Sequence, residues 1–189
     1  MRETSGEPMA KTAKTGVVHV CPLSAVPSLV ARAKASHLIT LLQDEIVVER
    51  PLGIVPERHL RLCVHDISEP LLGCVHPEPT HVDEIIAFAR AWAGQGPMVV
   101  HCWAGISRST AAAYTALCSI NPEVPEDLIA ERLRRASPTA YPNRLMIRLA
   151  DRALGREGRM VRAIEAIGRG VVAGEAVPFA IAADLSLGT

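Results

Sequence analysis

The run Met98-Val99-Val100-His101 constrains the fold of this chain more than any other segment. It is short and apolar on both of its alternating faces, which is typical of a strand buried on both sides. Such a strand lies in the interior of a sheet, with other elements covering it above and below. The run therefore predicts a layered fold around a central strand.

Strand patterns alternate with helical patterns along most of the chain. Apolar or alternating runs bounded by turn residues predict strands, and apolar spacings of three and four predict helices. The expected strands are 17–21, 37–42, 60–65 and 98–101, and the expected helices are 26–35, 80–92, 108–119, 126–135, 144–154 and 157–167. Thr80 is expected to cap the second helix. This order predicts an α/β fold with a central, largely parallel sheet of about four to five strands flanked by helices.

The length of 189 residues suits one such domain, with little chain left for a second. Residues 1–15 are polar and aperiodic, and they are expected to form a flexible N-terminal arm. The domain is expected to span residues 16–168. Residues 169–189 are fairly apolar but show no clean period, so the sequence predicts no structure for this C-terminal tail.

The balance of charges limits the possible partners. The 20 basic and 20 acidic side chains give a net charge of zero, which argues against binding nucleic acid or a membrane through bulk charge. No segment has the pattern of a membrane span or of a secretory signal. The five cysteines are widely spaced and odd in number, which favours reduced thiols and a cytoplasmic location.

The segment 99–110 carries the predicted chemistry. It reads as a strand, a tight turn containing Gly105, and a helix. Such a turn directs successive backbone N–H groups into one concavity, where a tetrahedral oxyanion binds. Gly105 lets the chain approach the ligand closely, and the planar fork of Arg108 holds two oxygens. Of the five cysteines, only Cys102 has an arginine six residues further on.

Cys102 lies at the positive pole that these groups create. We expect its pKa to fall well below the free value of about 8.5, which makes it a thiolate nucleophile at neutral pH. The Ser109 hydroxyl is placed to donate a hydrogen bond to the sulfur and ease its departure. His101 is expected to support the loop through a hydrogen bond and not to act as a base.

The loop resembles the signature of the cysteine-dependent protein tyrosine phosphatases, and most closely that of their small dual-specificity branch. That signature is His-Cys-x-x-Gly-x-Ser-Arg-Ser, and every fixed position is met by His101-Cys102-Trp103-Ala104-Gly105-Ile106-Ser107-Arg108-Ser109. Weaker similarity extends over residues 17–154. The resemblance implies that residues 103–108 bind the phosphate. It also implies hydrolysis through a cysteinyl-phosphate intermediate, without a metal or other cofactor.

The same family uses an aspartic general acid some 30 to 40 residues before the nucleophile. Asp66 lies 36 residues before Cys102, between a predicted strand and a loop rich in Pro and Gly. Asp83, Glu69 or no acid at all are the alternatives. Asn143 belongs to a Pro-Asn pair that resembles the one before the last core helix of the family, where it orders the loop or only caps the helix.

The residues that fill the loop bear on the substrate. Trp103, Ala104 and Ile106 are uncharged, which favours a phosphomonoester with little further charge, such as phosphotyrosine in a protein, over a polyphosphorylated lipid. A small non-protein phosphomonoester is the alternative. Trp103 lines the substrate cleft or simply covers the loop. Basic residues from elsewhere can add charge at the rim, and the candidates are Arg61, Arg144 and Arg148.

Three other interpretations compete with this one. Cys63, His65, Cys74 and His76 form two Cys-x-His pairs that provide enough ligands for a zinc site, although the spacing is unusual. A cysteine loop of this general type also occurs in sulfur transfer and arsenate reduction. A phosphopeptide-binding relic without catalysis is the third, and the presence of both a nucleophile and an acid argues against it.

Overall fold

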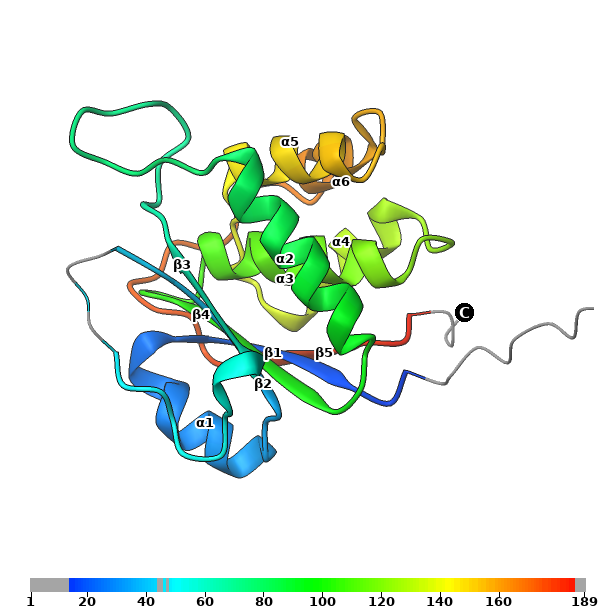
Figure 1. Cartoon of the computed structure of the whole chain (residues 1–189). Helices are drawn as coiled ribbons and strands as arrows, with labels where there is room; N and C mark the ends of the chain where they lie inside the picture. The colour runs from blue at the N-terminus through cyan, green and yellow to red at the C-terminus, as the bar shows by residue number, and fades with distance from the viewer. Residues whose placement is uncertain (1–13, 44–45, 47, 186–189) are drawn as a thin grey trace, which may run out of the picture.

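A five-stranded sheet forms the centre of the computed structural model, which describes residues 14–43, 46 and 48–185 (Figure 1). The strand order is β3-β2-β4-β1-β5. The strands are β1 (Val17–Pro22), β2 (His37–Leu42), β3 (His59–Cys63), β4 (Pro97–Cys102) and β5 (Phe179–Ala182). The first four are parallel to one another, and β5 pairs antiparallel with β1 at one edge. The predicted fold class is therefore confirmed.

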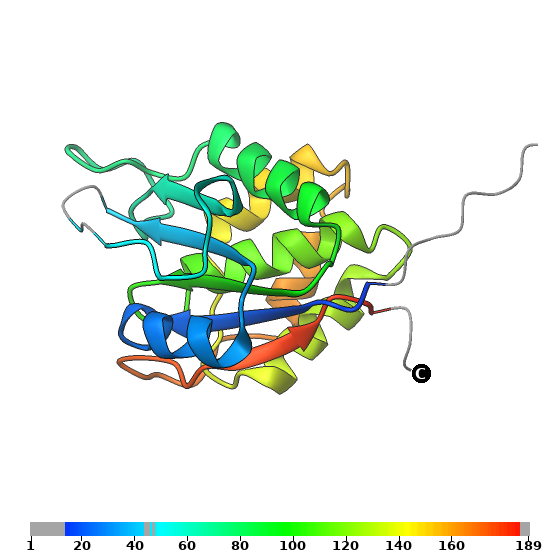
Figure 2. The same cartoon turned by 60° about the horizontal axis from the view of Figure 1, so that its bottom comes forward.

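Helices cover both faces of the sheet, as the apolar run 98–101 requires (Figure 2). Helix α1 (Val26–Ala33) packs on one face with a small apolar cluster. The larger core lies on the other face. That face carries α2 (Pro79–Trp92), α3 (Arg108–Ile120), α4 (Glu126–Ala136), α5 (Arg144–Ala153) and α6 (Arg159–Ala166). Two short 3-10 turns, η1 (Leu23–Ala25) and η2 (Pro56–Arg58), precede α1 and β3 respectively.

Helix α3 lies in the middle of the larger core, and all of its residues are buried. Its alanines keep the helix thin, so that it packs closely against the sheet and against α2, α4 and α5. The buried Thr115 hydroxyl donates to the carbonyl of Ala111, which satisfies a polar group that has no access to water. This burial fixes the start of α3 relative to the end of β4, and the loop between them carries the predicted chemistry.

Two helix starts differ from the sequence prediction. Glu78, and not Thr80, caps α2, because Pro79 fits the first helical position and the Glu78 side chain forms a reciprocal capping box with His81. Helix α6 begins at Arg159, later than expected. The buried Asp151 carboxylate accepts hydrogen bonds from the N–H groups of Gly158 and Met160 at that start, at 2.6 and 2.9 Å.

The segment after residue 168 has a defined place in the domain, although its sequence predicts no structure. Strand β5 pairs with β1, and the buried Ile181 packs into the larger core. The Asn121 side chain donates to the carbonyl of Ala183 at 2.9 Å. The expected flexible arm lies almost entirely outside the described residues. Among the helices of the described part of the chain, none is long and apolar enough to cross a membrane.

Candidate active site

An open cleft of about 650 Å³ lies at the carboxyl ends of the parallel strands. In open α/β sheets this edge is the usual location of ligands. The cleft is lined by Gln43, Ile46, Asp66, Cys102, Trp103, Ala104, Ile106, Ser107, Arg108, Ala173 and Gly174. The structure therefore places Cys102, Arg108 and Asp66, which are distant in sequence, around one cavity.

The backbone of the loop 102–108 is held from outside the cleft. Four of its carbonyl groups accept hydrogen bonds from backbone N–H groups of surrounding segments: Trp103 from Leu23 (3.0 Å), Ala104 from Ala176 (2.8 Å), Ile106 from Tyr141 (2.9 Å) and Ser107 from Asn143 (3.3 Å). In a trans peptide the C=O and the following N–H point in opposite directions. The N–H groups that follow these carbonyls therefore face inward, where they form a cradle for an anion.

The loop conformation at position 105 accepts glycine and no residue with a Cβ. Its φ is +73°, in the left-handed region. A Cβ at this position would lie 2.7 Å from the carbonyl carbon of Cys21 and 2.7 Å from the nitrogen of Pro22. Both are backbone atoms at the end of β1, so neither moves without disturbing the sheet.

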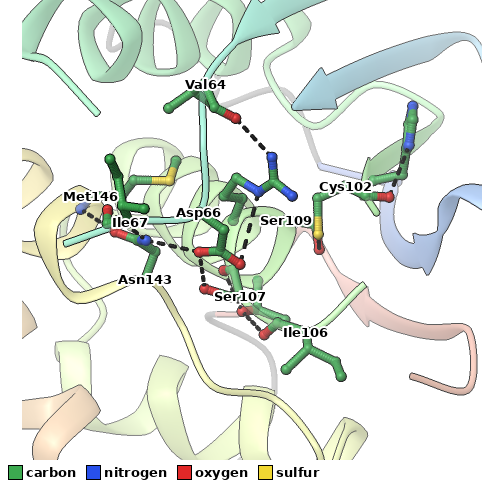
Figure 3. A network of polar contacts seen from close by, with 12 residues as sticks. Val64, Asp66, Ile67, Cys102, Ile106, Ser107, Ser109, Asn143 and Met146 are labelled. Carbon is green, nitrogen blue, oxygen red and sulfur yellow. Dashed lines mark hydrogen bonds and ion pairs between the residues drawn. The ribbon is translucent and has the colours of Figure 1, made fainter. Parts of the chain in front are cut away.

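Cys102 ends β4 and is buried beneath the loop, with its sulfur 3.1 Å from the Ser109 hydroxyl oxygen (Figure 3). Ser109 lies in the first turn of α3 and is also fully buried. Either atom can be the donor across this distance. Burial, and secondarily the neighbouring Cys102, raises the pKa of Cys21 to about 12. Cys21 therefore stays a neutral thiol at physiological pH.

The Arg108 side chain is buried, with 5% of the residue exposed. Its Nη1 donates to the carbonyl of Val64 at 2.7 Å, which fixes the guanidinium at the cleft wall. Its Nε is buried without a hydrogen-bond partner, and Asp66 Oδ2 lies 3.9 Å from it. Because a buried N–H group without a hydrogen bond is costly, this nitrogen indicates that the site can take an anion that accepts one.

Asp66 follows β3 in the loop before α2, and its side chain is 37% exposed toward the cleft. One carboxylate oxygen accepts hydrogen bonds from the Ser107 hydroxyl at 2.6 Å and from Asn143 Nδ2 at 2.9 Å (Figure 3). Asn143 also caps α5, since its side-chain oxygen accepts from the N–H groups of Leu145 and Met146. Asn143 therefore caps the helix and also contacts Asp66, so it is more than a cap.

His101 is fully buried in the sheet behind the loop. Its Nε2 lies 2.8 Å from the Thr40 hydroxyl, and its Nδ1 lies 3.4 Å from the Cys102 carbonyl oxygen. Burial lowers the pKa of His101 to about 4, and the nearby charges of Arg108 and Arg61 act in the same direction. The ring is therefore neutral at physiological pH, in a position that supports the loop and is removed from the cleft.

Several residues weighed from the sequence lie elsewhere. Asp83 is an exposed residue of α2, and Glu69 is 86% exposed and 4.0 Å from Arg148. Neither lines the cleft, and neither do the three proposed rim arginines, Arg61, Arg144 and Arg148. The alternative zinc site is not assembled: among the described residues, no three His, Cys, Asp or Glu side chains form a group that could hold a metal.

Sequence reasoning missed Gln43, Ile46 and the pair Ala173–Gly174 as cleft residues. Residues 173 and 174 belong to the segment that crosses from α6 to β5, and Ala176 of that segment binds the loop directly. Ser24 also donates to Glu175 at 2.9 Å. The sequence contains no periodic signal for this wall, because it is irregular chain held by single contacts.

The fold is that of the dual-specificity phosphatases. Similar solved structures include DUSP15, at 20% identity and a TM-score of 0.59 over 81% of this chain and 95% of that chain. PTPMT1 in complex with PI(5)P is 16% identical, with a TM-score of 0.56 over 80% of this chain and 96% of that one. The human tyrosine phosphatase-like serine/threonine/tyrosine-interacting protein is 17% identical, with a TM-score of 0.56 over 74% and 92%. A scan against family models and a search of curated proteins both find no match. The resemblance seen in the loop sequence thus extends to the fold.

Replacing Gly105 with Ala should distort the cradle. We expect the free energy of unfolding to fall by about 1–3 kcal/mol, because the new Cβ meets backbone atoms. The affinity for tungstate, a tetrahedral oxyanion used as a probe of the cradle, should fall about tenfold or more. Denaturant titration and calorimetry measure the two effects. Gly53→Ala is the matched control, because Gly53 also has a positive φ (+93°) but has open space around its Cβ position. Equal losses in the two variants would contradict the steric role of the end of β1.

The depressed pKa of His101 should make stability depend on pH. Between about pH 4 and 6.5 the unfolded chain binds more protons than the folded one, so stability falls as pH is lowered through this window. The full effect is on the order of 3 kcal/mol. His101→Asn should lose clearly less stability between pH 7 and 4.5 than the unmodified protein, as measured by urea unfolding. Some loss should remain, because burial also lowers the pKa of His19, His37 and His59. An equal loss of stability between pH 7 and 4.5 in both proteins would show that the pKa of His101 is not lowered on folding.

Proposed function

We propose that this protein hydrolyses phosphomonoesters without a metal, through a cysteinyl-phosphate intermediate, and that phosphotyrosine in a protein is its main substrate class. One observation carries the proposal. The Cys102 sulfur, the Arg108 Nε, which makes no hydrogen bond, and the Asp66 carboxylate surround one cleft whose backbone N–H groups face inward. Nucleophile, anion cradle and acid are the three parts that such a reaction needs.

In the first step, the Cys102 thiolate attacks phosphorus, and the bond from phosphorus to the ester oxygen breaks. Protonated Asp66 gives its proton to the departing oxygen, so the alcohol or phenol leaves neutral. The inward N–H groups and Arg108 stabilise the charge that the transition state spreads over the three remaining oxygens. Because both are fixed before substrate binds, little reorganisation is needed.

In the second step, water attacks the phosphorus of the cysteinyl-phosphate, and the S–P bond breaks. Asp66, now ionised, takes a proton from the water, and inorganic phosphate is released. The Cys102 sulfur departs as a thiolate. The Ser109 hydroxyl, 3.1 Å from the sulfur, stabilises that thiolate by a hydrogen bond.

The lining of the cleft supports a substrate with little charge beyond its phosphate. Arg108 is the one basic residue among the described residues that line it, and much of the remaining surface comes from Ile46, Trp103, Ile106 and Ala173. Trp103 is 54% exposed, which leaves its ring available at the cleft. An aromatic ring carrying the phosphate fits such walls better than a second phosphate group does. The presence of Cys102, Asp66 and Ser109 together argues against a relic that only binds phosphopeptides.

Cys102→Ser should abolish hydrolysis of phosphotyrosine peptides, because the serine hydroxyl is not ionised at neutral pH and is a much weaker nucleophile than a thiolate. Phosphate or tungstate binding should persist, since the cradle and Arg108 remain. A coupled phosphate-release assay and calorimetry measure the two properties. Cys74→Ser, at a free cysteine outside the cleft, is the matched control and should keep full activity. Full activity in Cys102→Ser would refute the proposed mechanism.

Asp66→Asn should lower kcat for phenyl phosphate by about 10²–10⁴-fold, because the amide has no proton to give to the basic leaving oxygen. The alkaline limb of the pH profile should flatten. The loss should be smaller for p-nitrophenyl phosphate, whose leaving oxygen needs less protonation. Glu69→Gln and Asp83→Asn serve as controls, because they test the alternative acids. If kcat fell by about 10²–10⁴-fold in either control, and the pH profile of Asp66→Asn were unchanged, Asp66 would not be the general acid.

A further inference from the structure

A second, smaller pocket lies beside the catalytic cleft, between α5, α6 and the segment that follows α6. Its volume is about 190 Å³, below the roughly 300–1,000 Å³ of pockets that take drug-sized ligands. This size suits a single side chain. Its apolar lining comes from Pro142, Ile147, Val161 and Ile164. Its polar lining comes from Tyr141, Arg144, Arg148, Glu165 and Arg169.

Two of these arginines are held at the Tyr141 ring. The guanidinium carbon of Arg169 lies 5.5 Å from the ring centroid, and that of Arg144 lies 6.0 Å from it. Among the described residues, neither guanidinium makes an ion pair or a hydrogen bond. Both are exposed. The ring thus positions two cations whose donors are available to a ligand.

The other charges at this pocket leave an excess of positive charge. Arg148, one helical turn after Arg144, is already engaged by Glu69 at 4.0 Å and by the Ser68 carbonyl at 3.5 Å. Glu165 is the acidic residue of the lining, and it offsets one of the two free cations at most. The pocket therefore combines an apolar floor with a net positive rim.

The segment 141–143 connects the pocket with the wall of the catalytic cleft, since Tyr141 and Pro142 line the pocket. Tyr141 donates its N–H to Ile106, and Asn143 donates its N–H to Ser107, so this segment is bonded to the cleft wall. Arg144 is the next residue, which places the rim of the pocket within about 10 Å of that wall. An extended peptide covers such a distance with about three residues.

We propose that this pocket, the Arg144–Arg169 pocket, binds an acidic side chain of the same polypeptide whose phosphorylated residue occupies the catalytic cleft. The stem of a glutamate, or the ring of a second phosphorylated tyrosine, packs on the apolar floor. Its anionic end meets Arg144 and Arg169. The inference rests on the proposed function, since it names a feature of the substrate.

A polypeptide explains the pocket better than a phosphoinositide headgroup does. A headgroup is polar throughout and gains nothing from the floor made by Ile147, Val161 and Ile164. An acidic side chain has an apolar stem, which can pack on the floor of the pocket, and a charged end, which can reach the arginines at its rim. The spacing from the cleft also matches a chain of a few residues.

The test compares phosphotyrosine peptides in which a single glutamate is moved along a background of glutamine. In the unmodified protein, glutamate at one or two positions should raise kcat/KM about tenfold, which is the gain that two exposed charge pairs provide. Arg144→Gln/Arg169→Gln should remove this gain. The matched control, Arg90→Gln/Arg152→Gln, changes two exposed arginines outside the pocket and should keep it. All three proteins should hydrolyse phenyl phosphate equally and unfold at the same temperature.

The outcomes separate this proposal from the proposed function. No gain at any position, or a gain that survives in Arg144→Gln/Arg169→Gln, would overturn the Arg144–Arg169 pocket while leaving catalysis intact. Loss of activity toward PI(5)P vesicles in that variant, with peptides unaffected, would also overturn it in favour of a lipid. If no phosphomonoester is hydrolysed, the proposed function fails. Calorimetry of the unphosphorylated glutamate peptides then tests the pocket by itself, and binding that is lost in the double variant supports it.

Discussion

The orientation of the peptide groups in the loop 102–108 is the constraint on which the rest of the site depends. An isolated loop would not keep its N–H groups facing one point, because they repel one another and water competes for them. Here four carbonyls are bonded from outside by Leu23, Ala176, Tyr141 and Asn143. These partners come from the chain after β1, before β5 and before α5. Much of the domain therefore serves to hold one short turn in a conformation that favours an anion.

The same arrangement explains why the side chains of the candidate active site, which come from distant segments, meet. Parallel strands end at one edge of the sheet, so the chain after β3 delivers Asp66 to the place where β4 delivers Cys102. Asn143 links the parts, because it caps α5, donates to Asp66 and bonds the loop through its backbone. A change at Asn143 therefore acts on the loop, the acid and a helix start together. It is best read as a positioning residue for the proposed reaction.

Much of the site is predictable because it is local. Gly105, Arg108 and Ser109 have fixed offsets from Cys102, and those offsets alone define the turn, the cation and the hydroxyl. The strand 98–101 was predictable because a strand that is apolar on both faces requires cover on both. Thr80 misled because Pro79 favours the first helical position and Glu78 provides its own capping box. The start of α6 was missed because its stabilising carboxylate, Asp151, lies on the preceding helix.

The sequence by itself determined the class of fold and the residues of the loop, because hydrophobic period and residue spacing are local properties. Only the tertiary structure decided what surrounds that loop. Ala173 and Gly174 became a cleft wall because β5 pairs with β1 and draws the preceding chain past the loop. Arg144 and Arg169 became neighbours because both lie at the Tyr141 ring, although 25 residues separate them. Such contacts depend on the packing of helices and irregular chain, which leaves no periodic trace in the sequence.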